Sequence, residues 1–202
     1  ATPIPRTVAM TAFGDLDVTA MRELPKGRTP VTTFRVPEEN SVWMGRLWER
    51  AKEEVQAGGR VYVVVPRISD TEKEDGPKLP SVDMVAQKLR QEPALSGVPI
   101  GVVHGQARAE ENAEVLRAFA EGRTPILVAT TVVEVGVDVP EATMMIIWGA
   151  QQFGLSQLHQ LRGRVGRSDR ESIAMLVHPS ELAPVADERM QALVDSHDGF
   201  AL

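Results

Sequence analysis

Five short apolar runs without polar alternation constrain this chain more than any other feature. Each is four or five residues long and rich in β-branched side chains, and they occupy 61–65, 100–103, 126–129, 144–147 and 173–177. A strand with one wet face alternates apolar and polar residues, whereas a continuous apolar run is typical of a strand buried on both faces. We therefore expect a sheet covered on both sides, with a further strand at 31–36.

Helical patterns lie between these runs. Apolar side chains recur at every fourth residue from Trp43 to Val55, with Ser41 as the predicted cap. A similar pattern at about 82–89 is preceded by Ser81 as its predicted cap, and further patterns occupy about 108–121 and 182–193. Strands that alternate with helices predict an α/β fold, a doubly wound parallel sheet with helices on both faces. Ligands of such sheets bind beyond the carboxyl ends of the strands.

Length and composition fit one domain. The chain has 202 residues, 43% of them hydrophobic, a formal net charge of −6 and no cysteine. Since a domain averages roughly 150 residues, we expect 31–202 to form it and the proline-rich 1–30 to form a linker with a short helix. The absence of cysteine excludes disulfides and fits a reducing cytoplasm. No apolar run approaches the ~20 residues of a membrane span, and the acidic balance argues against coating nucleic acid through bulk charge.

The densest chemical signal is an arginine-rich segment. Residues 162–170 hold four arginines against one acid, Asp169. The planar guanidinium group of arginine matches phosphate oxygens, and Gly163 and Gly166 let a backbone approach a ligand closely. The segment favours a phosphate site, and the alternative is a solvated helix end.

Hydroxyl groups follow the apolar run at 126–129. Thr130 and Thr131 stand at the expected strand end, and Gly136 and Asp138 come shortly after. Hydroxyls and unpaired backbone amides at such a point suit a phosphate oxygen, and an aspartate suits a ribose hydroxyl. The alternative is that these residues only cap turns.

Three absences limit the chemistry that this chain performs alone. The sequence has no G-x-x-x-x-G-K-S/T loop for nucleotide phosphates, no D-E-x-H box for Mg²⁺ and no G-x-S-x-G nucleophile turn. Its four histidines, one of them in the pair His104-Gly105, lack metal-ligand spacing, so no metal site is expected. An arginine-rich site without a nucleotide cradle is typical of one half of a two-part ATPase.

Together these segments resemble the second RecA-like motor domain of superfamily 2 helicases. Residues 160–167 match the Q-x-x-G-R-x-G-R block of that superfamily, and 130–140 match its T-x-x-x-E-x-G-x-D-x-P block. The longer run at 152–167 narrows the resemblance to two families, RecG and the transcription-repair coupling factors. Gly-Asp-Leu-Asp at 14–17 and Glu-Leu-Pro-x-Gly-Arg-x-Pro at 23–30 favour the RecG family of bacterial branched-DNA translocases.

The resemblance implies roles for individual residues. Arg167 resembles the arginine finger that reaches the γ-phosphate of ATP on a first motor domain, Arg164 resembles its partner, and Gln160 an orienting group. The positions implied for ATP binding or coupling are Gly136, Asp138, Gly163, Gly166 and Thr2. Those implied for contacts to the DNA backbone are Thr130, Thr131, Pro66, Arg67, His104 and Gly105.

The resemblance also implies cofactors, partners and a location. A whole protein of this kind uses ATP and Mg²⁺, bound mainly by the first motor domain, to remodel stalled forks and Holliday junctions in the bacterial cytoplasm. Its partners are branched DNA, the first RecA-like domain and single-stranded-DNA-binding protein, and the isolated second domain is expected to be inactive. Two alternatives stay open: a coupling-factor domain, and a non-catalytic α/β module that binds a nucleotide or a protein.

Overall fold

Six parallel strands form one sheet in the described part of the chain. The structure, a computed structural model, describes residues 29–66, 80–130 and 139–195. The strand order is β1-β6-β5-β2-β4-β3, and every neighbouring pair is parallel. The strands are β1 (Val31–Pro37), β2 (Arg60–Val64), β3 (Ile100–Val102), β4 (Ile126–Ala129), β5 (Ala142–Trp148) and β6 (Ser172–His178).

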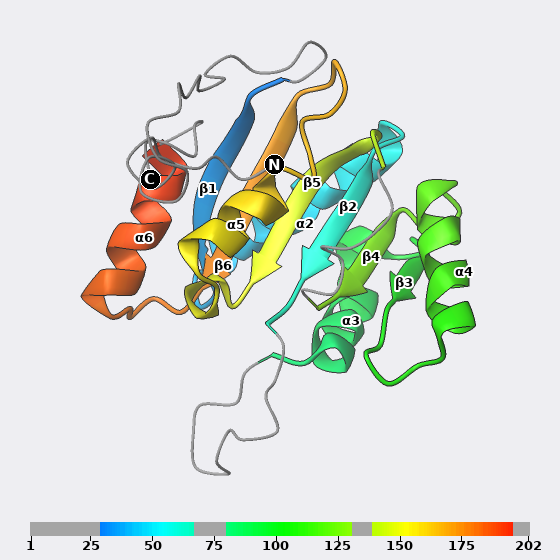
Figure 1. Ribbon diagram of the computed structural model, residues 1–202, viewed down its shortest axis with the longest axis horizontal. Helices are drawn as coiled ribbons and strands as arrows, with labels where there is room; N and C mark the ends of the chain where they lie inside the picture. Colours follow the sequence, from blue (N-terminus) through cyan, green and yellow to red (C-terminus); the bar gives the residue numbers. More distant parts are fainter. Residues whose placement is uncertain (1–28, 67–79, 131–138, 196–202) are drawn as a thin grey trace, which may run out of the picture.

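Helices cover both faces of this sheet (Figure 1). α2 and α3 pack on one face, and α4, α5 and α6 pack on the other. The bounds are α2 (Ser41–Gln56), α3 (Val82–Gln91), α4 (Ala109–Ala120), α5 (Leu155–Arg162) and α6 (Pro184–Asp195), with short 3-10 turns η1 (Pro93–Leu95) and η3 (Ala150–Gln152). The predicted doubly wound parallel α/β fold is confirmed.

Alternating side chains of the central strands build two separate cores. In β2, Val61 and Val63 contribute to the α2/α3 side and Tyr62 to the opposite side, and none is more than 2% exposed. Every residue of β5 and of β6 is buried as well. Burial of a large apolar side chain contributes about 1.5–3 kcal/mol, so a strand between two helical layers gains from being apolar at every position.

The predicted helix boundaries hold with one correction. Asn40 Oδ1 accepts a hydrogen bond from the Trp43 amide at 3.1 Å, so Asn40 caps α2 and Ser41 is its first helical residue. Ser81 caps α3 as predicted, because its hydroxyl accepts from the Met84 amide at 3.2 Å. Helix α5 adds to the predicted helices, since its eight residues are too few to show a clear apolar stripe.

The domain boundary at residue 31 stays a prediction. Residue 31 is the first residue of β1. Of the linker predicted at 1–30, the structure describes only residues 29 and 30. Within the described ranges, no helix is long and apolar enough to cross a membrane.

Candidate phosphate and nucleic-acid sites

The predicted site residues that the structure describes lie at two opposite edges of the sheet (Figure 1). Pro66, His104 and Thr130 follow the carboxyl ends of β2, β3 and β4, which are neighbours in the sheet. The arginine-rich segment instead follows α5 and leads into the amino end of β6. Since the helix between two parallel strands returns the chain across the sheet, α5 joins one edge to the other. The predicted DNA contacts and the predicted catalytic arginines are therefore separated.

At the carboxyl edge, backbone hydrogen bonds bring the three predicted turns together. The Val65 amide donates to the Ala129 carbonyl and the Val103 amide to the Val128 carbonyl, each at 2.9 Å. The described residues Pro66, His104 and Thr130 consequently follow neighbouring strands at the same edge. Pro66 is buried, Thr130 and His104 are half-buried and Gly105 is exposed.

Asn112 fixes the turn at His104, and sequence reasoning missed it. Its Nδ2 donates to the His104 carbonyl at 2.8 Å, and its Oδ1 accepts from the His104 amide at 3.3 Å. Asn112 lies on α4, so its amide ties this helix to the turn after β3. On the other side, Asp83 Oδ1 of α3 lies 3.6 Å from His104 Nε2. The sequence signal for this residue was an isolated asparagine near the start of the helix predicted at about 108–121.

Two of the four clustered arginines hold structural elements together. Arg162 is 5% exposed and donates from Nη1 to the Leu193 carbonyl of α6 at 2.7 Å. Its burial lowers the pKa of this arginine from the ordinary value, because the low-dielectric interior disfavours the charged form. Arg170 donates from Nη2 to the carbonyl of Ala57, directly after α2. The sequence shows only that four arginines lie close together. It does not reveal that two of them, Arg162 and Arg170, bond to other elements of the fold.

The other two arginines, Arg164 and Arg167, are half-exposed on the turn after α5. Arg167 Nε donates to the Gly163 carbonyl at 3.0 Å, which holds one side of its guanidinium against the helix end. Gln160 lies exposed on the last turn of α5. The structure thus places the three predicted catalytic residues on one short stretch of surface.

Gly166 allows this turn to adopt its shape. Its φ is +74°, and a Cβ there would lie 2.7 Å from Val31 Cγ2 and 2.8 Å from the Thr29 carbonyl oxygen. The Gly166 amide donates to Ser172 Oγ at 3.0 Å, and its carbonyl accepts from the Thr29 amide at 3.2 Å. These two hydrogen bonds clamp the turn, which means that they fix it to Thr29, just before β1, and to Ser172, the first residue of β6. Gly163 has an ordinary helical φ of −67°, so its predicted role in ATP binding stays a prediction.

The donor groups present suit phosphate oxygens rather than a metal ion. Over the described residues, no group of three or more His, Asp or Glu side chains is placed to hold a metal. Guanidinium groups match the oxygens of a phosphate through paired N–H donors. The guanidinium groups at the arginine turn therefore suit the oxygens of a phosphate group. The predicted site residues outside the described ranges are Thr2, Arg67, Thr131, Gly136 and Asp138.

Comparison with known proteins decides the family. The model of the helicase conserved C-terminal domain matches residues 44–169, which include both the β4 end and Gln160 to Arg167. The chain belongs to this helicase domain family. Over 208 aligned residues it is 42% identical to ATP-dependent DNA helicase RecG of Mycobacterium leprae, covering 100% of this chain and 28% of the relative. A solved structure of RecG bound to a three-way DNA junction aligns with a TM-score of 0.75 at 40% identity, over 98% of this chain and 25% of that one.

The helicase domain also shares its fold with more distant proteins. S. cerevisiae Dbp5 bound to RNA and ADP BeF3 aligns with a TM-score of 0.61 at 16% identity, over 98% of this chain and 47% of that one. The predicted RecA-like fold is confirmed, and the chain is a RecG-like helicase C-terminal domain of superfamily 2. It spans little more than a quarter of the length of the curated RecG relatives.

We expect Gly166→Ala to lower the free energy of unfolding by more than the ~1–2 kcal/mol that a left-handed backbone costs a residue with a Cβ, because the new methyl also meets Val31 and the Thr29 carbonyl. Gly45→Ala is the matched control. Gly45 lies inside α2 with nothing within 4 Å of the added Cβ, so alanine there is expected to stabilise the helix by about 0.5–1 kcal/mol. Urea unfolding of the three proteins measures both effects, and equal stability of Gly166→Ala and the unchanged chain would contradict the clamp.

Proposed function

We propose that this chain is the second motor domain of an ATP-dependent translocase that acts on branched DNA, including stalled forks and Holliday junctions. In this proposal the chain works within a longer polypeptide that also carries the first RecA-like domain, as its coverage of RecG relatives favours. The observation that carries the proposal is the placement of Arg164 and Arg167 on a clamped turn, remote from the carboxyl edge where Thr130 and His104 lie. A motor needs such separate surfaces for nucleotide and for DNA.

At the amino edge, Arg167 acts as the arginine finger and Arg164 assists it. ATP with Mg²⁺, bound mainly by the first domain, supplies the phosphoryl group that is transferred to water. The two guanidiniums stabilise the negative charge that develops on its oxygens, and Gln160 orients groups in the same site. Because the turn is tied to Thr29 and Ser172, the arginines keep their positions when the two domains approach each other.

At the carboxyl edge, backbone and hydroxyl groups contact the sugar-phosphate backbone of DNA. Thr130 and the turn at His104 and Gly105 stand side by side after β4 and β3, and Pro66 follows the adjacent β2. Contacts of this kind carry no sequence information, which suits a translocase that moves along any DNA. Such contacts are compatible with the net negative charge of the chain, because they depend on individual hydrogen-bond donors and not on an overall positive charge.

Other parts of the proposal concern the whole protein. Alone, the 202-residue chain is expected to lack DNA-stimulated ATPase activity, because it has no phosphate cradle. We propose that the whole protein works in the bacterial cytoplasm and that single-stranded-DNA-binding protein is a further partner. The likeness to RecG over the whole chain favours this function over a coupling-factor domain.

We expect Arg167→Lys in the full-length protein to lower the kcat of ATP hydrolysis by about 10³-fold while ATP affinity changes little, since lysine keeps the charge and loses the guanidinium geometry. Steady-state hydrolysis at saturating DNA and nucleotide binding by fluorescence give the two quantities. Arg170→Lys is the matched control, because Arg170 lies on the same turn and donates to the Ala57 carbonyl. A normal kcat for Arg167→Lys would remove this residue from the finger role.

We expect the double variant Thr130→Ala with Thr131→Ala to raise the DNA concentration needed for half-maximal ATPase about tenfold, as lost hydrogen bonds to phosphate imply. Basal hydrolysis without DNA should stay near its normal rate. The exposed Thr32 of β1 offers the control substitution Thr32→Ala, which should change neither quantity. Equal loss of basal and stimulated activity would place the two threonines at the nucleotide instead.

A further inference from the structure

A buried arginine stands directly before the turn that carries the proposed arginine finger. Arg162 is the last residue of α5 and is 5% exposed. The Q-x-x-G-R-x-G-R block at 160–167 accepts any residue at this position, so the block gives Arg162 no role. Burial lowers the pKa of its guanidinium group, because removal from water disfavours the charged form. A charged side chain in such a place needs partners that compensate for the lost water.

Arg162 finds a partner at the end of another helix. Its Nη1 donates to the Leu193 carbonyl at 2.7 Å, and α6 ends at Asp195. The last four carbonyls of an α-helix have no donor within the helix and form the negative end of its dipole. Arg162 Nη2 also lies 3.4 Å from His159 Nδ1. The guanidinium group therefore caps α6 from α5, with a hydrogen bond and with a positive charge.

Helix α6 is itself fixed to the sheet. Arg35 of β1 pairs with Asp187 of α6, with 2.5 Å between Nη2 and Oδ1. Arg189 of α6 donates from Nη2 to the Gln151 carbonyl of η3 at 2.8 Å. Helices α5 and α6 lie on the same face of the sheet and share one core (Figure 1). A bond to α6 consequently fixes the end of α5 relative to the domain as a whole.

The backbone carries the position of Arg162 into the arginine turn. The Arg162 carbonyl accepts from the amide of Val165 at 3.3 Å, and Val165 is 2% exposed. The next residue, Gly163, has the carbonyl that accepts from Arg167 Nε at 3.0 Å. The arginine that caps α6 and the carbonyl that holds the Arg167 guanidinium thus belong to consecutive residues. A shift of the end of α5 would displace both.

We infer that Arg162 is a positioning residue for the arginine finger. Through the Leu193 carbonyl it fixes the end of α5, and through Gly163 it fixes the direction of Arg167. The inference rests on the proposed function, because it takes Arg167 as the finger. Reaction rates fall steeply when a catalytic group is misplaced, by about 100-fold for a displacement of about 1 Å. A hydrogen bond outside the site can therefore control the rate.

The kinetics of Arg162→Met in the full-length protein test this role. Methionine is unbranched and suits a buried site, but it donates no hydrogen bond to the Leu193 carbonyl. We expect the kcat of ATP hydrolysis at saturating DNA to fall about 10- to 100-fold. ATP affinity and the DNA concentration for half-maximal activity should change less than about twofold, since the variant removes neither ligand contact.

A double variant separates positioning from general stability. In the Arg167→Lys background the finger geometry is already lost, so adding Arg162→Met should lower the single-turnover rate less than about twofold. A residue that only stabilises the fold would lower the rate by the same factor in both backgrounds. Equal factors, or an unchanged kcat for Arg162→Met, would overturn the inference.

Arg162→Lys gives a second test if the methionine variant does not fold. Lysine keeps the charge and can donate to the Leu193 carbonyl, but it lacks the planar fork that also reaches His159. We expect a smaller loss of kcat, about threefold, and the same comparison in the Arg167→Lys background applies. A normal kcat for Arg162→Lys together with an unfolded Arg162→Met would assign Arg162 to stability alone and overturn the inference.

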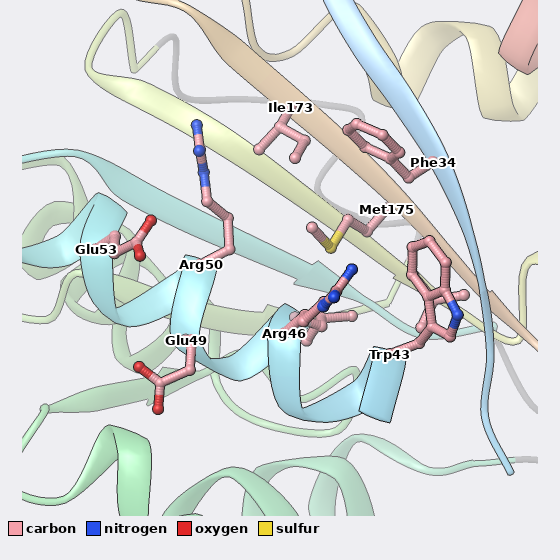
Figure 2. Close-up of a pocket in the computed structure, with 10 residues that line it drawn as sticks. Phe34, Trp43, Arg46, Glu49, Arg50, Glu53, Ile173 and Met175 are labelled. Carbon is pink, nitrogen blue, oxygen red and sulfur yellow. The ribbon is translucent and has the colours of Figure 1, made fainter. Parts of the chain in front are cut away.

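Arg50→Met is the matched control. Arg50 Nη2 lies 2.8 Å from Glu54 Oε1, and Glu54 is 8% exposed, so this variant also removes an arginine from a buried partner. Arg50 lines the groove between α2 and the strands β1 and β6, on the face of the sheet opposite α5 (Figure 2). Stability should fall while kcat stays within about twofold of normal. A loss of kcat as large as that of Arg162→Met would overturn the inference.

The proposed function and the inference fail in different ways. A normal kcat for Arg167→Lys would contradict the finger role itself. A low kcat for Arg167→Lys with a normal kcat for Arg162→Met would contradict only the positioning role of Arg162 and leave the function standing.

Discussion

The parallel direction of all strands in the described sheet governs where function can reside. Parallel neighbours cannot be joined by tight turns, so each connection between them leads the chain from the carboxyl edge of the sheet back to the amino edge. Pro66, Thr130 and His104, which follow β2, β4 and β3, lie at the carboxyl edge, and the turn before β6 lies at the amino edge. One constraint thus separates the surface proposed for DNA from the surface proposed for nucleotide. It also buries the central strands on both faces, which stabilises the domain.

The arginine turn is connected to most of the domain. Arg162 joins it to α6, Arg170 joins it to the end of α2, and Gly166 joins it to the entry of β1. Movement of this turn as a whole relative to the rest of the domain would break these hydrogen bonds. In the proposed motor cycle the domain accordingly moves as a rigid body, and its approach to the first motor domain brings the arginines to the nucleotide.

Sequence patterns predicted the fold better than the site. The apolar runs and the Ser81 cap located strands and a helix because burial and capping act locally on each segment. The roles of Arg162 and Arg164 differ only through tertiary contacts, since one meets the Leu193 carbonyl and the other stays half-exposed. Asn112 was missed for the same reason: its two hydrogen bonds to His104 exist only once α4 packs beside β3.

The central claim is that nucleotide and DNA contact opposite edges of this domain, and photocrosslinking tests it most directly. The full-length protein would be irradiated with ATP that carries a photoreactive group on its γ-phosphate, and separately with DNA that carries such groups on its backbone. Mass spectrometry would then locate the labelled peptides. The account predicts that the nucleotide labels the peptide containing Arg164 and Arg167, and that DNA labels peptides containing Thr130 and His104. DNA labels on the arginine turn, or nucleotide labels at the carboxyl edge, would contradict it.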